Sequence, residues 1–340
     1  MSVELPPALA EAVDDLLADA NPRDLARASA DLSARYREKR PRGAPIARSQ
    51  TDLLAYVAAR LPATYAAVSA VLEAVQKQRP GWQPRSVLDL GAGPGTALSS
   101  TAAHWPMLDR AAAVEAEPKM LALGRQLAAA SNHPAVRAAT WIHADVAALS
   151  TSQLADLGGP FDLVVLAYVL GELPPTRLLD VVTLAAEATA PGGVTLIVEP
   201  GTPEGYARMI DTRTQLLSLP GGARHVTAPC PHDAPCPIPE NDWCHFSVRL
   251  SRTAGHRMAK GGALGYEDEK FAYVAVTNGP TAQAAARIIR HPQTRPRLIQ
   301  LELCTQGGLV SRTVTKSDRD GFRAARKAAW GDTFAMSPGA

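Results

Sequence analysis

The chain has 340 residues, 46% of them hydrophobic, and a net charge of +2, so it can bury a large core and its overall charge indicates no partner. No apolar run approaches the roughly 20 residues that a membrane-spanning helix needs, which argues against a membrane partner. The acidic N-terminus lacks the cationic start of a secretory signal, so we expect a cytoplasmic protein with reduced cysteines.

Residues 1–80 are predicted to form an N-terminal helical region. Apolar residues recur there at spacings of three and four, first over 53–61 and again over 65–75. Pro62 marks a break between the two stretches, and the segment "RPRGAPIARSQ" is predicted to be a loop.

Residues 81–218 alternate between strand and helix patterns. Nearly continuous apolar strands are expected at 86–91, 110–117, 140–146, 161–170 and 194–201, and helices at 95–105, 118–131, 175–189 and 202–218. Alternating elements with buried strands are typical of an α/β fold with a doubly wound, Rossmann-like parallel sheet. We therefore predict a nucleotide-type binding core in this region.

Residues 219–262 and 263–340 complete the predicted domain organisation. The first segment is rich in proline, glycine and cysteine, and it is too long for a plain connection, so we interpret it as a functional insertion. The second is expected to hold a strand at 271–276, a hairpin of 297–305 with 309–316, and a basic helix over 319–330.

Charge is unevenly distributed along the chain. Residues 85–208 carry 12 acidic and 7 basic side chains, whereas residues 249–340 carry 15 basic and 7 acidic ones. The stretch "RYREKRPR" at residues 35–42 is a second basic block. This segregation indicates basic surfaces for a polyanion beside a less basic core, although ordinary solvated faces explain it equally well.

The segment "DLGAGPGT" closes a predicted strand and opens a predicted helix. Gly91, Gly93 and Gly95 allow a tight turn that a ligand can approach, and the helix N-terminus behind them favours an anionic group. The spacing G-x-G-x-G differs from the G-x-G-x-x-G of dinucleotide sites. With Asp89 two residues before the first glycine, it resembles the first motif of class I methyltransferases, so an S-adenosylmethionine (SAM) site is favoured over a nicotinamide site.

Two later acids and one loop extend the predicted site. Glu115 ends the second strand, where it could bind the ribose hydroxyls of SAM, and Asp145 follows the third strand, where it could bind the adenine amino group. Amino-group methyltransferases keep an acid-Pro-Pro-aromatic motif where this chain has "LAYVLGELP". Tyr168 and Glu172 are the nearest candidates to contact an acceptor, and Tyr168 as an aromatic at the edge of the core is an equal alternative.

The four cysteines of the chain are Cys230, Cys236, Cys244 and Cys304. Three of them lie in one proline-rich loop with the spacing C-x5-C-x7-C, which lacks the paired C-x2-C of zinc ribbons and the C-x3-C-x2-C of radical-SAM enzymes. Wide spacing suits an iron–sulfur cube, in which each iron takes one thiolate. An iron–sulfur cluster is therefore favoured, with zinc and four metal-free thiols as alternatives.

Several motifs together resemble a known family. In chain order they include "YREKR", "VLDLGAGPGTA", "YVLGELP", "VEPGTPEGY", the three-cysteine loop, "LELCTQGG" and "TKSDRDGFRAARKAAWGD". From about residue 30 to about residue 333 the chain resembles the small-ribosomal-subunit methyltransferase-like assembly factors, a family known in mitochondria.

The resemblance implies a class I methyltransferase fold, SAM as cofactor and a 4Fe–4S cluster on the four cysteines. It also implies that the partner is the small ribosomal subunit and its RNA, with a monomer off the ribosome. Three functions follow as hypotheses: an rRNA methyltransferase, a non-catalytic assembly factor that keeps the methyltransferase fold, and a small-molecule methyltransferase.

Overall fold

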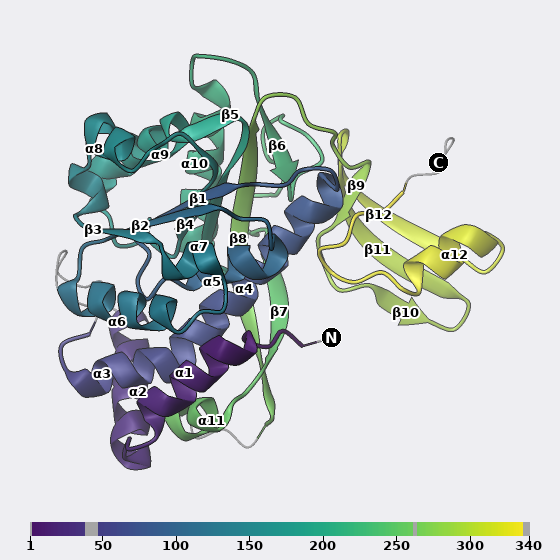
Figure 1. The fold of residues 1–340 in the computed structure, drawn as a ribbon. Helices are drawn as coiled ribbons and strands as arrows, with labels where there is room; N and C mark the ends of the chain where they lie inside the picture. Colours follow the sequence, from purple (N-terminus) through teal and green to yellow (C-terminus); the bar gives the residue numbers. More distant parts are fainter. Residues whose placement is uncertain (1, 38–46, 261–263, 336–340) are drawn as a thin grey trace.

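The computed structural model describes residues 2–37, 47–260 and 264–335 of the chain. Most of the basic block at residues 35–42 and of the loop predicted after it lies outside the described residues. The described chain forms a large sheet with helices on both faces, and the last part forms a smaller sheet beside it (Figure 1).

The large sheet carries the core of the fold. Its strands are β1 (Ser86–Leu90), β2 (Arg110–Glu115), β3 (Thr140–His143), β4 (Phe161–Ala167), β5 (Thr189–Pro200), β6 (Arg224–Ala228), β7 (Phe246–Ser251) and β8 (Tyr266–Asn278). They are ordered β3-β2-β1-β4-β5-β8-β6, with β7 also paired to β8. Strands β1 to β5 are parallel, and β8 runs antiparallel to β5, β6 and β7. This is the class I methyltransferase-like Rossmann fold, which confirms the predicted fold class at that level.

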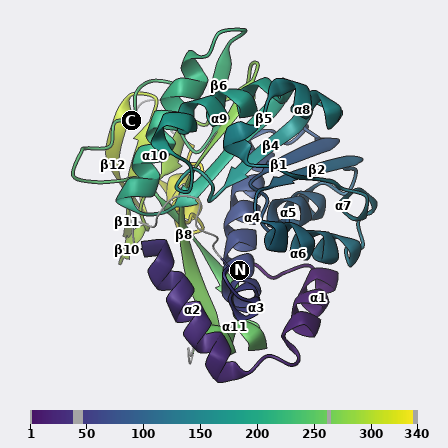
Figure 2. The same ribbon diagram turned by 90° about the vertical axis from the view of Figure 1, so that its left-hand side faces the viewer.

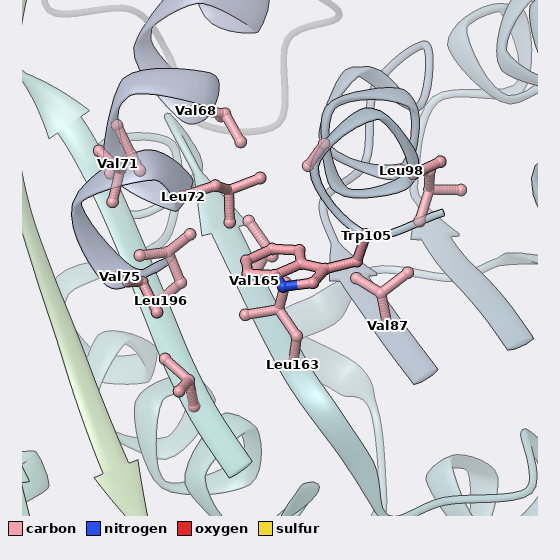
Figure 3. Close-up of a cluster of buried hydrophobic side chains, with 14 of the residues drawn as sticks. Val68, Val71, Leu72, Val75, Val87, Leu98, Trp105, Leu163, Val165 and Leu196 are labelled. Carbon is pink, nitrogen blue, oxygen red and sulfur yellow. The ribbon is translucent and has the colours of Figure 1, made fainter. Parts of the chain in front are cut away.

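Helices cover both faces of this sheet because its buried strands are apolar on both sides. The helices of the core are α5 (Thr96–His104), α6 (Pro118–Ala129), α7 (Pro134–Arg137), α8 (Thr151–Asp156), α9 (Pro175–Glu187) and α10 (Pro203–Ser218), with a 3-10 turn η2 (Val146–Ala148). Alternate residues of β4 face opposite layers: Leu163 packs with α4 (Leu61–Gln78) and α5, whereas Val164 packs with α9 and α10. Figure 3 shows the first of these layers, where Trp105 lies among valines and leucines of the sheet and helices.

The N-terminal region is helical, as predicted. Its elements are α1 (Pro7–Leu17), α2 (Pro22–Arg37), α3 (Gln50–Ala55), a π-helical turn η1 (Tyr56–Arg60) and α4 (Leu61–Gln78). The expected break at Pro62 does not occur, because Pro62 lies in the first turn of α4 and the preceding turn widens to a π-helix.

The joined helix Gln50–Gln78 passes the length and composition criteria for a membrane span, contrary to the sequence expectation. However, 78% of its most apolar window is buried inside the protein, and α4 packs against the large sheet. We therefore interpret it as a helix of the hydrophobic core.

The C-terminal part forms a separate small sheet. Its elements are β9 (Ala286–Ile288), β10 (Gln293–Arg295), β11 (Leu298–Thr305), β12 (Gly308–Thr315) and α12 (Arg319–Ala325). The predicted hairpin is present as β11 and β12, and the strand predicted at 271–276 lies in β8 of the large sheet. The segment 219–262, interpreted as a functional insertion, contributes β6, β7 and the helix α11 (Ala254–Lys260), which packs against α2 (Figure 2). The four domain boundaries stay a prediction.

Candidate functional site

The glycine turn follows β1 and leads into α5. Gly91, Gly93 and Gly95 have φ values of 75°, 52° and 77°, in the left-handed region that favours glycine. A Cβ atom at Gly91 would lie 2.4 Å from Cγ2 of Val169. The turn therefore requires glycine for both backbone conformation and space, and it brings backbone amides to the N-terminus of a nine-residue helix.

Two of the predicted acids lie at this turn. Asp89 is 2% exposed within β1, and its Oδ2 atom has no hydrogen-bond partner among the described residues. Burial, together with the nearby charge of Glu115, raises the pKa of Asp89 to about 8. At the end of β2, Glu115 accepts hydrogen bonds of 2.7 Å from the backbone amides of Gly93 and Glu117. The structure thus brings Asp89, Glu115 and the glycine turn together.

The third predicted acid has a local structural role. Asp145 caps the turn η2, because its Oδ1 accepts a hydrogen bond of 2.9 Å from the amide of Ala147. It is exposed and follows β3, which pairs with β2 in parallel. Asp145 therefore lies at the same edge of the sheet as Glu115.

The two predicted acceptor residues follow β4. Tyr168 has a φ of +62°, which is uncommon for a residue with a side chain, and its hydroxyl donates a 3.1 Å hydrogen bond to Glu269. Burial and then the charge of Glu269 raise the pKa of Tyr168 well above its usual value. Glu172 lies in the same loop and is exposed.

Sequence reasoning missed two groups that border this site. Tyr56 of the π-helical turn lies against the glycine turn, with its hydroxyl 3.6 Å from where a Cβ of Gly93 would be. Burial raises the pKa of Tyr56, and the charge of Arg60 opposes that shift. The guanidinium of Arg60 lies 5.9 Å from the ring centre of Tyr168. A helical sequence pattern carries no signal for a π-turn, so these contacts could not be anticipated.

The second missed group holds the acceptor loop. Glu199, at the end of β5, is fully buried and accepts a 2.7 Å hydrogen bond from Nε of Arg208 and a 3.2 Å bond from the amide of Leu170. Arg208 belongs to α10, so this helix is tied to the loop after β4. The sequence does carry a signal for this role, because Glu199 is an acid near the end of an otherwise apolar strand.

The four cysteines line one cavity, although Cys304 lies on β11 and the others lie between β6 and β7. The hydroxyl of Tyr206 is 3.2 Å from Sγ of Cys236, and Nε2 of His232 is 3.4 Å from Sγ of Cys304. The other cavity residues are mostly apolar: Met209, Ile210, Pro229, Ile238, Phe246, Tyr273 and Ile289.

The four thiols also influence one another electrostatically. Burial raises the pKa values of Cys230, Cys244 and Cys304, that of Cys304 to about 12. Neighbouring cysteines add to each shift, and Cys244 is affected by all three others. Four thiolates in this pocket would therefore need positive charge to remain ionised.

A metal centre itself is not shown. The part of the chain that the structure describes contains no group of three His, Cys, Asp or Glu side chains that could hold a metal ion. The expected Cys-rich metal-binding insertion is thus present as a cysteine-lined cavity, and the role of its four cysteines stays a prediction.

Comparison with protein families identifies the chain. A family model described as "Mitochondrial small ribosomal subunit Rsm22" matches residues 50–335. The chain belongs to the Rsm22 family. It is 30% identical over 295 residues to the human (Homo sapiens) protein "Ribosome assembly protein METTL17, mitochondrial", covering 82% of this chain and 61% of that protein. It is 24% identical over 342 residues to "Rsm22-cox11 tandem protein 2, mitochondrial" of Schizosaccharomyces pombe, covering 85% and 44%. The chain therefore spans about half to three fifths of the length of these Rsm22-family relatives.

Solved methyltransferases follow a similar chain path. The N-methyltransferase NodS of Bradyrhizobium japonicum WM9, with S-adenosyl-L-homocysteine, is 15% identical with a TM-score of 0.38, over 61% of this chain and 84% of that one. A precorrin-6y C5,15-methyltransferase of Geobacter metallireducens GS-15 is 16% identical with a TM-score of 0.38, over 61% and 85%. For this Rsm22-family chain the fold assignment rests on the strand order of its own sheet.

The relatives correct one expectation. The Rsm22 family model and the named relatives are all mitochondrial, so the predicted cytoplasmic localisation is wrong on this finding, which points to mitochondria. Composition led to the error because reduced cysteines and the lack of a secretory signal do not distinguish the two compartments.

Proposed function

We propose that this protein binds SAM and a 4Fe–4S cluster and acts at the RNA of the small ribosomal subunit, as an rRNA methyltransferase or an assembly factor. The observation that carries the proposal is the combination, in one chain, of a class I sheet with a left-handed glycine turn and a cavity lined by four cysteines. The family supports the ribosome as partner, because one relative is named a ribosome assembly protein.

The glycine turn, buried Asp89 and partly buried Glu115 suit SAM. The N-terminus of α5, into which Gly91, Gly93 and Gly95 lead, would hold the methionyl carboxylate, and Glu115 would take the ribose hydroxyls. Asp145 would face the adenine, and buried Asp89 would face the cationic end of the ligand. Bound SAM supplies an electrophilic methyl group, and the protein's part is to align an acceptor with it.

The cysteine cavity suits an iron–sulfur cube. Its donor set is four thiols in an apolar surrounding, with Cys304 supplied by the small sheet. A 4Fe–4S cube takes one thiolate per iron, so its four sulfur ligands need not converge on one ion. That requirement favours the cluster over zinc, which binds its four ligands at one point.

The small sheet and its helix suit an RNA backbone. Exposed basic side chains gather on this part of the chain: Arg295, Arg297, Lys316, Arg319, Arg323, Arg326 and Lys327. Phosphate contacts from such residues give binding that weakens steeply with salt. We propose that this surface contacts rRNA and that the protein is a monomer off the ribosome.

One observation favours the non-catalytic assembly factor over the methyltransferase. The hydroxyl of Tyr168 donates to Glu269, and burial raises the pKa of Tyr168 well above its usual value, so Tyr168 is not arranged as a base for an acceptor.

The proposal can be tested in three steps with one preparation. Anaerobically purified protein should contain about four irons and a brown chromophore, and titration calorimetry should detect SAM binding. A preparation with neither iron nor chromophore would rule out the cluster. Mapping methylated bases in small-subunit rRNA with and without the gene then separates the two functions. Deletion of the gene removes a methyl group from the rRNA only if the protein is a methyltransferase.

A further inference from the structure

Two buried arginines lie beside the cysteine cavity. Arg213, on α10, is 2% exposed, and Arg287, on β9, is 3% exposed. Burying a guanidinium away from water is costly unless an opposite charge compensates it. Their surroundings therefore indicate what the cavity holds.

Both guanidinium groups are anchored by neutral carbonyls of the cavity's own segments. Nη2 of Arg213 donates to the carbonyl oxygens of His232 and Ala234, at 2.9 and 2.8 Å. Nε of Arg287 donates to the carbonyl of Pro229 at 2.7 Å. These bonds fix the orientation of the two cations but supply no negative charge.

Neither cation is neutralised by a carboxylate. Within residues 2–37, 47–260 and 264–335, no ion pair includes Arg213 or Arg287. Moreover, Nε of Arg213 and Nη2 of Arg287 are buried without a hydrogen-bond partner in that part of the chain. Each arginine therefore has one donor and a full charge still to be satisfied.

The cysteine sulfur atoms that line the cavity are groups that can carry the missing charge. Arg287 stands directly opposite Cys304 in the antiparallel pair of β9 and β11. Both arginines also donate to carbonyls of the segment that carries Cys230 and Cys236, Arg213 to His232 and Ala234 and Arg287 to Pro229. The cations are thus placed to act on the thiols from two sides, one from α10 and one from the small sheet.

We propose that Arg213 and Arg287 are the counter-charges of the cluster, donating their free N–H groups to its sulfur atoms and compensating its negative charge. This inference rests on the cluster of the proposed function. The oxidised core of a 4Fe–4S cube carries two positive charges, so four thiolates leave a dianion, which two guanidinium groups neutralise. Positive charge and hydrogen bonds at the sulfurs favour the more negative reduced state, so the pair raises the reduction potential.

The test compares Arg213→Gln and Arg287→Gln with a matched control, Arg290→Gln. Arg290 lowers the pKa of a cavity cysteine, Cys244, but it is paired with Asp242 and is 29% exposed. The midpoint potential is measured by an electrochemical titration followed by the visible absorption, with iron content determined on the same samples. We expect both test variants to shift to lower potential, each by more than the control.

Lysine variants separate charge from folding. Arg213→Lys and Arg287→Lys keep the charge and should recover part of the potential shift, while far-ultraviolet circular dichroism confirms the fold. If the glutamine variants keep their iron and the wild-type potential, the counter-charge proposal is wrong. It is also wrong if folded lysine variants lose iron as completely as glutamine variants. Wild-type protein without iron would instead refute the cluster itself, which distinguishes the two failures.

Discussion

At the scale of single residues, Asp89 is the group whose ionisation is most clearly linked to ligand binding. Its pKa is raised to about 8 by burial and by Glu115, so near pH 7 it is mostly protonated in the free protein. A cationic ligand favours the ionised form, so SAM binding should release a proton and strengthen as the pH rises toward 8. We expect SAM affinity to increase several-fold from pH 6 to 7.5, measured by titration calorimetry.

The control is Asp89→Asn, which cannot ionise. Its SAM affinity should be lower at pH 7.5 and nearly constant over the same range. Calorimetry in two buffers of different ionisation enthalpy should also show proton release for the wild type only. If SAM affinity depends equally on pH in both proteins, ionisation of Asp89 does not cause the pH dependence of SAM binding.

Gly91 tests whether the turn needs space as well as a left-handed backbone. In Gly91→Ala, the new Cβ would meet Val169 at 2.4 Å, and overpacking of this kind costs about 1–3 kcal/mol. The left-handed conformation costs a further ~1–2 kcal/mol. We expect the variant to lose stability by both amounts in urea unfolding and to lose SAM binding.

A second glycine isolates the contact with Val169. Gly192 has a φ of +73° with no atom within 4 Å of its would-be Cβ, so Gly192→Ala carries the backbone cost alone. Equal losses of stability in the two variants would show that the Val169 side chain moves to accommodate the new Cβ atom, so that space does not restrict the turn.

At the scale of elements, Glu267 joins helix α11 to the large sheet. Its carboxylate accepts hydrogen bonds from Arg252, His256 and Lys260, at 3.0, 3.0 and 2.8 Å. Hydrogen bonds to charged groups contribute about 1.5–3 kcal/mol, so Glu267→Gln should destabilise the protein by roughly 2 kcal/mol in urea unfolding. Asp268→Asn is the matched control, because that side chain is 42% exposed and should lose much less.

The core elements could be predicted because their signals are local in sequence. The strand before "GAGPGT", the glycines themselves and Glu115 lie within 30 residues, and the parallel fold brings such strand ends to one edge. The grouping of Cys230, Cys236 and Cys244 in one loop is visible in the sequence, whereas the inclusion of Cys304 was implied only by the family resemblance, because Cys304 lies on a strand of the small sheet.

Other features depend on packing that no local pattern records. The π-helical turn that places Tyr56 and Arg60 at the site looks like ordinary helix in the sequence. The roles of Glu199 and Arg208 arise from a contact between β5 and α10. Arg213 and Arg287 look like surface residues in the sequence, and only the fold buries them.

At the scale of the whole molecule, the cysteine cavity joins the two sheets. Three cysteines come from the connection between β6 and β7 of the large sheet, and Cys304 comes from β11 of the small sheet. A cluster shared between them would fix the small sheet in place, so iron removal by a chelator should expose the segment 229–245 to proteolysis. The measurement is limited chymotrypsin digestion, which can cleave after Trp243, followed by mass spectrometry. The chelator should leave the cleavage of an iron-free Cys304→Ser variant unchanged.

The basic surface of α12 gives the prediction that concerns function on the ribosome. Arg323, Arg326 and Lys327 are exposed and lie on or just after that helix. Each phosphate contact contributes to the salt dependence of binding, so changing all three to Glu should weaken binding of small-subunit rRNA and flatten its dependence on salt concentration. Filter binding at four salt concentrations measures both effects.

The control moves the same change of charge to another face of the protein. Arg23, Arg27 and Arg257 are exposed on α2 and α11, which pack together away from the small sheet (Figure 1). Reversing these three charges alters net charge equally, so a general loss of attraction to RNA would weaken binding in both variants. Loss confined to the α12 variant identifies a docking surface, and rRNA binding that survives the α12 reversal would show that another surface contacts RNA. No rRNA binding by the wild type would favour a small-molecule methyltransferase.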